Sequence, residues 1–422
     1  MMKRVEQSLV EIGSPSIQVS VNGRMRLTCP VRVQGVALPE QVYYEVDATY
    51  GDYLVDSRSD AFLVGLLPLI LGCGGKVRCA APVSAHLLHN LRYRLANVVR
   101  DFEASGWRSL EIEAESDDSP LGGSHVGTGC SCGVDSCATI AVYSDPDVPK
   151  DMRIDTLAFF NVGSHGDCRH ATVAEREKRD ALFAGRLERV RMFAAAAGMP
   201  LLVVDSNLQE FGMGLSHKAT ETFRNTSAVL ALAKWFGAYH CASAHKATRF
   251  SFTLHSIARS DIYLLDCFST ESTRFHSALS AYSRYERLAL IGAYEPALRY
   301  LDVCVDRVGN CLRCVKCVRT LFQLEMWGKL DSFSSVFDVA GFRSHPWRML
   351  TRAMKDKAYH CEYVTQMEEM QGCGHRLPLP FWVYRLSFFI SHWLETCSEL
   401  RHRVKVAVRG MRRTCSLDAH RK

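Results

Sequence analysis

No apolar segment of this 422-residue chain is long enough to cross a bilayer, which takes about 20 residues. The longest such run, residues 61–73, ends in a glycine turn and therefore predicts a buried helix. The basic pair Lys3-Arg4 is followed at once by polar residues, which argues against a secretory signal. Hydrophobic residues make up 47% and charged residues 23%, and this ordinary balance excludes disordered and fibrous classes. These features predict a soluble cytoplasmic protein of two or three domains.

Net positive charge is lacking outside one end of the chain. The formal net charge is +6, and residues 398–422 contain eight Lys or Arg and two acidic residues, so the remainder is formally neutral. A neutral body argues against sequence-specific DNA binding. The basic tail follows an aromatic segment at 381–397, a combination typical of helices that meet an anionic lipid surface or an acidic protein partner. The alternative is a helix packed on the body, followed by a solvated tail.

Cysteine, in contrast, is abundant, with 17 residues. In a chain without a secretory signal, such thiols are expected to bind metal or to react rather than to form disulfides. Cys304, Cys311, Cys314 and Cys317 lie close together, and the two-residue gaps allow one turn to present neighbouring thiolates to Zn²⁺. Four protein ligands predict a closed, structural zinc site. Buried structural cysteines and an iron–sulfur cluster are the alternatives.

The pattern of apolar runs predicts an α/β fold. Strands are expected at 156–160, 201–204, 239–243 and 262–266, alternating with helices at 171–197, 217–236 and 276–300. This rhythm indicates a parallel sheet with helices on both faces, in which ligands bind beyond the carboxyl ends of the strands. Residues 1–120 predict a separate, small α+β domain with a hairpin turn at Asn22-Gly23, followed by a linker at 113–123.

A turn of small residues, Ser131-Cys132-Gly133-Val134-Asp135-Ser136, precedes a predicted helix at 137–143. Such a turn exposes consecutive backbone N–H groups beside the positive end of a helix, which favours binding of a phosphate or pyrophosphate. The Ser131 and Ser136 hydroxyls are further donors, and Asp135 is suited to capping the helix or holding Mg²⁺. An ordinary capped helix after a glycine turn is the alternative interpretation.

This loop resembles the Ser-Gly-Gly-x-Asp-Ser loop of the PP-loop ATP pyrophosphatases, within the adenine nucleotide alpha hydrolase superfamily. Ser131, Gly133, Asp135 and Ser136 match that pattern, whereas Cys132 stands where the family has its first glycine. The resemblance implies that the loop grips the β,γ-pyrophosphate of Mg²⁺-bound ATP while a substrate oxygen attacks the α-phosphorus. Ser131, Asp135 and Ser136 are the catalytic residues that it implies, with the Cys132 and Val134 positions completing the nucleotide contact.

Further short patterns are similar to the branch containing 7-cyano-7-deazaguanine synthase, which also has a C-x-x-C-x-x-C zinc knuckle after its nucleotide domain. The resemblance implies nucleotide-binding roles for Asn161, Gly163, Asp205 and Ser206. It implies substrate-binding roles for Ser269, Thr270, Glu271 and Arg284. The predicted organisation is therefore an N-terminal α+β domain at 1–120, a PP-loop domain at 124–300, a zinc knuckle at 301–328, a helical extension at 329–397 and a basic tail at 398–422.

These features together predict an ATP-dependent ligase or synthase that activates a carboxylate-like oxygen of a small-molecule substrate by adenylation. Two alternatives remain open. One is a non-catalytic PP-loop module held together by zinc, and the other is a sulfurtransferase that modifies tRNA, for which the abundant cysteines would supply the chemistry.

Overall fold

The computed structural model describes residues 8–102, 105–164, 172–346, 371–372 and 374. Contacts divide the chain into a first unit of residues 1–344 and a second unit of residues 345–422. The predicted tail at 398–422 and most of the predicted extension at 329–397 lie outside the described residues, so both stay predictions. Within the described part of the chain, no helix combines the length and the apolar character that crossing a membrane requires.

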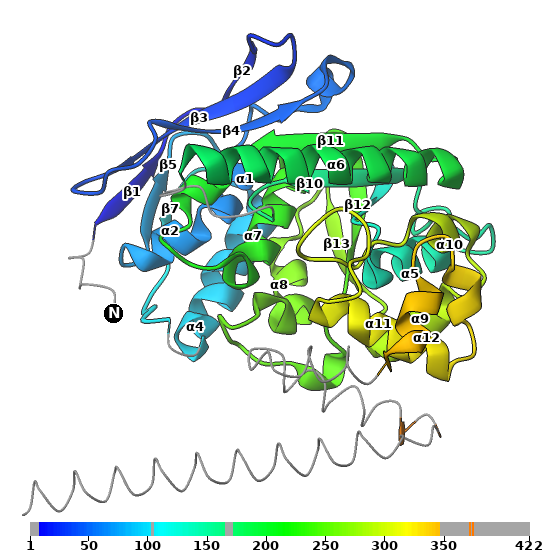
Figure 1. The fold of residues 1–422 in the computed structure, drawn as a ribbon. Helices are drawn as coiled ribbons and strands as arrows, with labels where there is room; N and C mark the ends of the chain where they lie inside the picture. The colour runs from blue at the N-terminus through cyan, green and yellow to red at the C-terminus, as the bar shows by residue number, and fades with distance from the viewer. Residues whose placement is uncertain (1–7, 103–104, 165–171, 347–370, 373, 375–422) are drawn as a thin grey trace, which may run out of the picture. The chain divides into compact units, whose positions relative to one another are not determined.

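The first unit is built on one eleven-stranded sheet (Figure 1). Five neighbouring strands run parallel in the order β13-β12-β9-β10-β11. The chain forms the middle strand first, adds two strands on one side, and then adds two on the other. The strands are β9 (His125–Gly129), β10 (Thr156–Asn161), β11 (Leu201–Ser206), β12 (Phe236–Ala242) and β13 (Arg274–Ala278).

The N-terminal strands continue the same sheet. β4 pairs with β11 in antiparallel register, with Glu45 opposite Asp205, so the predicted division near residue 120 does not interrupt the sheet. The predicted hairpin is present, and Gly23 takes the left-handed φ of +77° in its turn. These strands are β1 (Leu9–Ile12), β2 (Ser16–Val19), β3 (Met25–Val33), β4 (Gln41–Val46), β5 (Lys76–Cys79) and β7 (Glu111–Glu113), with β6 (Val83–Ser84) and β8 (Ser116–Asp117) forming a separate pair.

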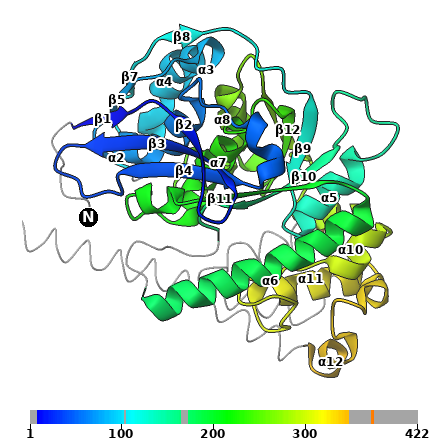
Figure 2. The ribbon, with the colours of Figure 1, turned by 90° about the horizontal axis from the view of Figure 1, so that it is seen from above.

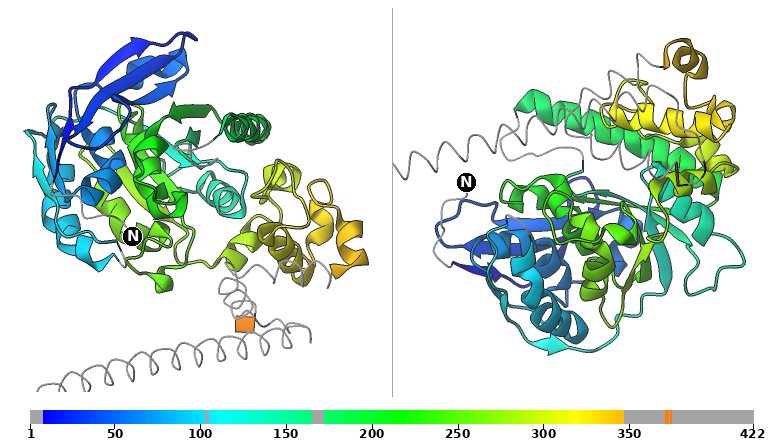
Figure 3. Two further views of the ribbon diagram at one scale, coloured as in Figure 1. Left: turned by 60° about the vertical axis from the view of Figure 1, so that its left-hand side comes forward. Right: turned by 90° about the horizontal axis from the view of Figure 1, so that it is seen from below.

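Helices flank both faces of the sheet, which confirms the coarse prediction of a mixed α/β fold (Figures 2 and 3). α5 (Val134–Tyr143) and α6 (Val173–Ala197) form one layer, and α9 (Arg284–Leu290) and α10 (Glu295–Tyr300) pack against them. α7 (His217–Leu230) packs against α1 (Asp60–Gly65) and α8 (Asp261–Phe268) in the other layer. The remaining helices are α2 (Leu67–Gly72), α3 (Ala85–Asn90), α4 (Ala96–Val98), α11 (Val315–Met326) and α12 (Val339–Ser344).

The apolar run at 61–73 is buried and helical, as predicted, and forms α1 and α2. Two other predictions are wrong. The expected strand at 262–266 belongs to α8, whose Leu264, Leu265 and Phe268 are buried while Ile262 is exposed, a helical rather than an alternating pattern. The expected helix at 276–300 begins in β13, and only α9 and α10 within that range are helical.

Close packing explains why the central strand β9 contains glycine. A Cβ atom on Gly127 would lie 2.4 Å from Cε1 of Phe236 on the neighbouring strand β12. A side chain there would force the two strands apart, so glycine permits the aromatic ring to cover the strand. This packing holds β9, and with it the loop that follows, against the core.

Candidate functional site

The loop at 130–133 connects the carboxyl end of β9 to the start of α5. β9 is the strand from which the chain turns first toward β10 and later, on the opposite side, toward β12. Connections leave such a point on opposite faces of a sheet, and the resulting crevice is where open α/β sheets bind ligands. The loop that the sequence singled out therefore lies at the position that this topology favours for a ligand.

Serine hydroxyls tie this loop to the first turn of α5. The Oγ atoms of Ser131 and Ser136 are 3.1 Å apart, and Ser136 Oγ also donates to the Gly133 carbonyl over 3.1 Å. Cys132, between them, has a φ of +56°. This left-handed conformation costs a residue with a Cβ atom about 1–2 kcal/mol, and glycine adopts it freely. The backbone at Cys132 thus has the conformation that suits a glycine.

Asp135 lies in the first turn of α5 and is held by two arginines of α9. Its Oδ2 accepts from Arg284 Nη1 at 2.5 Å, and its Oδ1 accepts from Arg287 Nη1 at 2.8 Å. Burial alone would raise the pKa of Asp135, but the two guanidinium groups outweigh that effect and lower it. Asp135 is therefore a carboxylate that orients two cations beside the loop.

Two further cations approach Asp135 from α11. Arg319 is buried and contributes to the lowered pKa of Asp135, and Lys316 is half-buried in the same region. Burial lowers the pKa of Lys316, and repulsion from Arg284 and Arg319 lowers it further. Asp135 and Glu221 attract the Lys316 ammonium and oppose these effects, so cations and carboxylates lie close together at the start of α5.

Sequence reasoning had named Arg284 but had missed Arg287, Lys316 and Arg319. A signal for Arg287 was present, because residues three apart on a helix share a face. Lys316 and Arg319 belong to the predicted zinc knuckle at 301–328. Their approach to Asp135 depends on how α11 packs, which the sequence does not reveal.

The predicted nucleotide contacts on the neighbouring strands lie at the same edge of the sheet. Asn161, at the end of β10, donates from Nδ2 to Asp205 Oδ1 on β11 over 2.8 Å. Gly163 has a φ of +110°, and a Cβ there would lie 2.0 Å from Nη1 of the buried Arg224. Ser206 is buried and donates to the Tyr43 carbonyl, so its hydroxyl joins the N-terminal strands to the parallel ones.

The predicted substrate residues separate into two places. Arg284 follows β13 and reaches the loop, whereas Ser269, Thr270 and Glu271 precede β13 and lie at the opposite, amino edge of the sheet. Glu271 accepts from the Ser84 hydroxyl and, at 2.7 Å, from the His86 N–H at the start of α3. The geometry gives Glu271 a structural contact with the N-terminal part, away from the loop.

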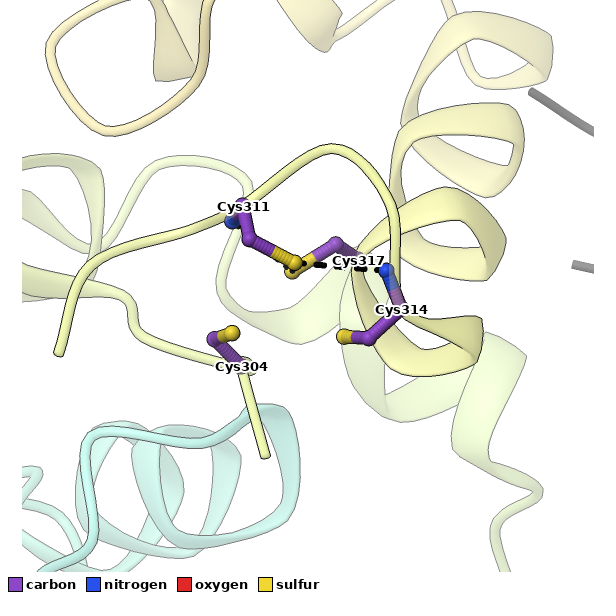
Figure 4. A group of neighbouring side chains, drawn as sticks. All are labelled: Cys304, Cys311, Cys314 and Cys317. Carbon is purple, nitrogen blue, oxygen red and sulfur yellow. Dashed lines mark hydrogen bonds between the residues drawn. The ribbon is translucent and has the colours of Figure 1, made fainter. Parts of the chain in front are cut away.

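The four predicted metal ligands come together (Figure 4). The Sγ atoms of Cys304, Cys311, Cys314 and Cys317 all lie within 4.8 Å of one another, so these side chains could hold a metal ion. Cys311 Sγ accepts N–H bonds from Arg313 at 3.4 Å and from Cys314 at 3.2 Å. The hydrogen bond between Cys314 and Cys317 lowers the pKa of the Cys314 thiol and raises that of Cys317, so the pair readily holds one thiolate.

The cysteine cluster and the loop are joined through the main chain. The Asp302 N–H, two residues before Cys304, donates to the Cys132 carbonyl over 2.8 Å. The Asp302 carboxylate in turn accepts from the N–H groups of Cys304 at 3.1 Å and Gly309 at 2.7 Å. The segment that carries the cysteines therefore also supports the left-handed turn of the loop.

Three buried thiols, those of Cys130, Cys132 and Cys137, lie in and behind the loop. A hydrogen bond with Cys130 and burial raise the pKa of Cys132, and burial raises that of Cys137. Thiols held in the neutral form are poor nucleophiles. This environment favours packing over sulfur chemistry.

The chain matches no protein-family model, and no curated protein or solved structure gave a match in the comparisons.

Proposed function

We propose that the chain binds ATP at residues 131–136 and transfers its adenylyl group to a carboxylate-like oxygen, in the manner of the PP-loop ATP pyrophosphatases that it resembles. The observation that carries this proposal is the position of the loop. It follows the middle strand of five parallel strands, where their order reverses, and Arg284 and Arg287 flank it.

The proposed reaction has two steps, adenylation of the substrate and displacement of AMP. A substrate carboxylate oxygen attacks the α-phosphorus, the bond from that phosphorus to the bridging oxygen breaks, and pyrophosphate leaves with its electron pair. A nitrogen nucleophile then displaces AMP from the acyl adenylate. Pyrophosphate leaves readily when its charge is neutralised, a role that the proposal gives to the loop N–H groups and to Arg284 and Arg287 beside Asp135.

Magnesium is assigned to the nucleotide rather than to Asp135. Both Asp135 oxygens accept from arginine, so this carboxylate is not available in the structure as a direct Mg²⁺ ligand. When bound with ATP, Mg²⁺ would neutralise phosphate charge. Asp135 acts in this scheme by holding Arg284 and Arg287 in position.

The proposed metal of the cysteine cluster is a single structural Zn²⁺. Tetrahedral coordination with Zn–S bonds of about 2.3 Å places sulfur atoms roughly 3.8 Å apart, and Sγ of Cys311 lies 3.9 Å from Sγ of Cys317. A multi-iron cluster binds its thiolates to different irons and needs wider spacing. Cys304, Cys311, Cys314 and Cys317 would fill the coordination sphere, which leaves no open position for catalysis.

Calorimetric titration with ATP tests the nucleotide assignment. We expect Ser136→Ala and Asp135→Ala to weaken Mg²⁺·ATP binding by roughly tenfold, about 1.4 kcal/mol each, because the first loosens the loop and the second releases its arginines. Ser144→Ala, at the far end of α5, is the matched control and should leave affinity unchanged. Unaltered ATP affinity in both loop variants would reject the assignment. If ATP binding is confirmed, measuring pyrophosphate release from ATP distinguishes an enzyme from a non-catalytic binding module.

A further inference from the structure

The outer edge of β2 is open. β2 lies at the margin of the eleven-stranded sheet, and β3 is its only partner among the described residues (Figure 1). The Ser20 N–H donates to the Arg24 carbonyl over 2.8 Å. Hydrogen-bonded and non-bonded pairs alternate along an antiparallel ladder. Gln18 therefore also directs its main-chain groups toward β3, whereas Ile17 and Val19 direct their N–H and C=O groups outward, where no described residue pairs with them.

The side chains along this edge do not protect it. Proteins usually guard an open edge with lysine, proline, a bulge or a covering segment. No charged residue occurs from 12 to 23, and the one proline there, Pro15, lies before β2. Val19 is 68% exposed and Val21 is fully exposed. An uncharged, partly apolar edge of this kind favours pairing with another strand.

The open edge is short, and both of its ends are fixed. After β2 the chain turns, and the Gly23 N–H donates to the Ser20 carbonyl over 2.9 Å. Before β2, the Ile12 carbonyl accepts from the Ala80 N–H over 2.9 Å, so the end of β5 occupies that part of the edge. An incoming strand therefore has to be short as well. The same edge of a second copy is equally short, and it brings no like charges together at a two-fold axis.

We propose that β2 pairs with β2 of a second copy of this chain in antiparallel register, around a two-fold axis at Gln18. In this register, Ile17 of each copy lies opposite Val19 of the other, and their outward N–H and C=O groups form four hydrogen bonds. The assembly closes at two copies, because both use the same edge. This inference goes beyond the proposed function and does not depend on it.

Sedimentation equilibrium of the full-length protein tests the pairing. We expect a reversible dimer that dissociates on dilution. Val19→Lys should raise its dissociation constant at least about tenfold, because two like charges then lie beside the axis on one face of the joined sheet. Val173→Lys is the matched control. It places the same charge on a valine of α6 that is 74% exposed, and should leave the dissociation constant unchanged.

Two further experiments separate loss of pairing from loss of folding. Val19→Pro removes an outward N–H but no hydrogen bond to β3, so it should abolish the dimer and change the melting temperature of the monomer little. A mixture of the Val19→Lys and Val19→Glu proteins should form a heterodimer, because opposite charges then meet across the axis.

Three results would overturn the inference. Native protein that stays monomeric up to about 1 mM does not pair with itself, and its open edge is then left to a strand of a different protein. A native dimer that persists in both Val19→Lys and Val19→Pro is joined through another surface. If both charged variants melt early and their mixture forms no heterodimer, Val19 has only a role in folding.

Discussion

Arg284 and Asp135 are 149 positions apart in the sequence, yet Nη1 of Arg284 lies 2.5 Å from Oδ2 of Asp135. This ion pair connects the helix that follows the last parallel strand to the helix that follows the middle one. Because Arg287, buried on the same helix, binds the other oxygen, a single carboxylate organises two cations at the edge of the loop.

Replacing Asp135 by Asn tests this arrangement. Arg287 would keep its buried charge without a counter-charge, so we expect the free energy of unfolding to fall by about 3 kcal/mol. Arg284→Met alone should cost less, since Arg284 is the more exposed of the two arginines. Urea denaturation of both single variants and the double variant gives the coupling energy between Asp135 and Arg284. Strictly additive effects would contradict the ion pair.

Cys132→Gly tests the conformation of the loop. Glycine removes the strain of a φ of +56° but also removes a buried thiol, so we expect stability to change by no more than about 1 kcal/mol. ATP affinity should stay equal or improve. Cys132→Val is the comparison and should be strongly destabilising, since a β-branched residue disfavours this conformation most. A sharp loss of ATP binding in the glycine variant would instead show that the thiol has its own role.

If the cysteine cluster binds zinc, removing one of its ligands should reduce metal content and thermal stability together. Cys314→Ser should lower both the zinc content and the melting temperature, because the free energy of metal binding is available to folding. The control is Cys73→Ser, a buried cysteine outside the cluster, which should lower the melting temperature and leave the zinc content unchanged. Elemental analysis that finds iron and acid-labile sulfide would reject the zinc assignment.

The raised pKa of Asp60 predicts that the stability of the protein depends on pH. Burial raises its pKa to about 7, although the Ser84 N–H and Arg58 act in the opposite direction. The stability associated with this raised pKa is fully present below pH 4 and is lost as the pH rises through about 7. Asp60→Asn should therefore be more stable than the native protein at pH 8, by a few kcal/mol at most, and the difference should shrink at pH 4.

Denaturation midpoints measured from pH 4 to pH 8 check this prediction. The neighbouring Asp117 and Glu271 carboxylates remain in both proteins, so their contribution cancels to first order. Asp52→Asn, at an exposed position, is the control and should follow the native pH profile. If Asp60→Asn has the same pH profile as the native protein, Asp60 does not titrate as proposed.

Local patterns predicted much of the fold. Small residues before a helix indicated the loop, and the cysteine spacing indicated the cluster, because both features depend on residues close together in the sequence. The apolar run at 262–266 gave a wrong strand prediction, because β-branched and aromatic residues also occur in a buried helix such as α8. That error had a consequence for the site. A strand at 262–266 would put Ser269, Thr270 and Glu271 at a carboxyl edge, whereas the actual strand begins at Arg274 and leaves them at the amino edge.

The cations of the site were harder to predict because they converge from different elements. Arg287 contacts Asp135 only through the packing of α9 on α5. Lys316 and Arg319 interact with it from α11, which packs against α9. Such contacts between distant parts of the chain leave no periodic signal in the sequence.

The most direct test of the central claim is a crystal structure of the zinc-loaded protein with Mg²⁺ and α,β-methylene ATP, which cannot release pyrophosphate. The account predicts the β- and γ-phosphates against the N–H groups of residues 131–136, with the Arg284 side chain directed at them. A nucleotide bound elsewhere on the chain, or bound with its phosphates away from this loop, would contradict the account.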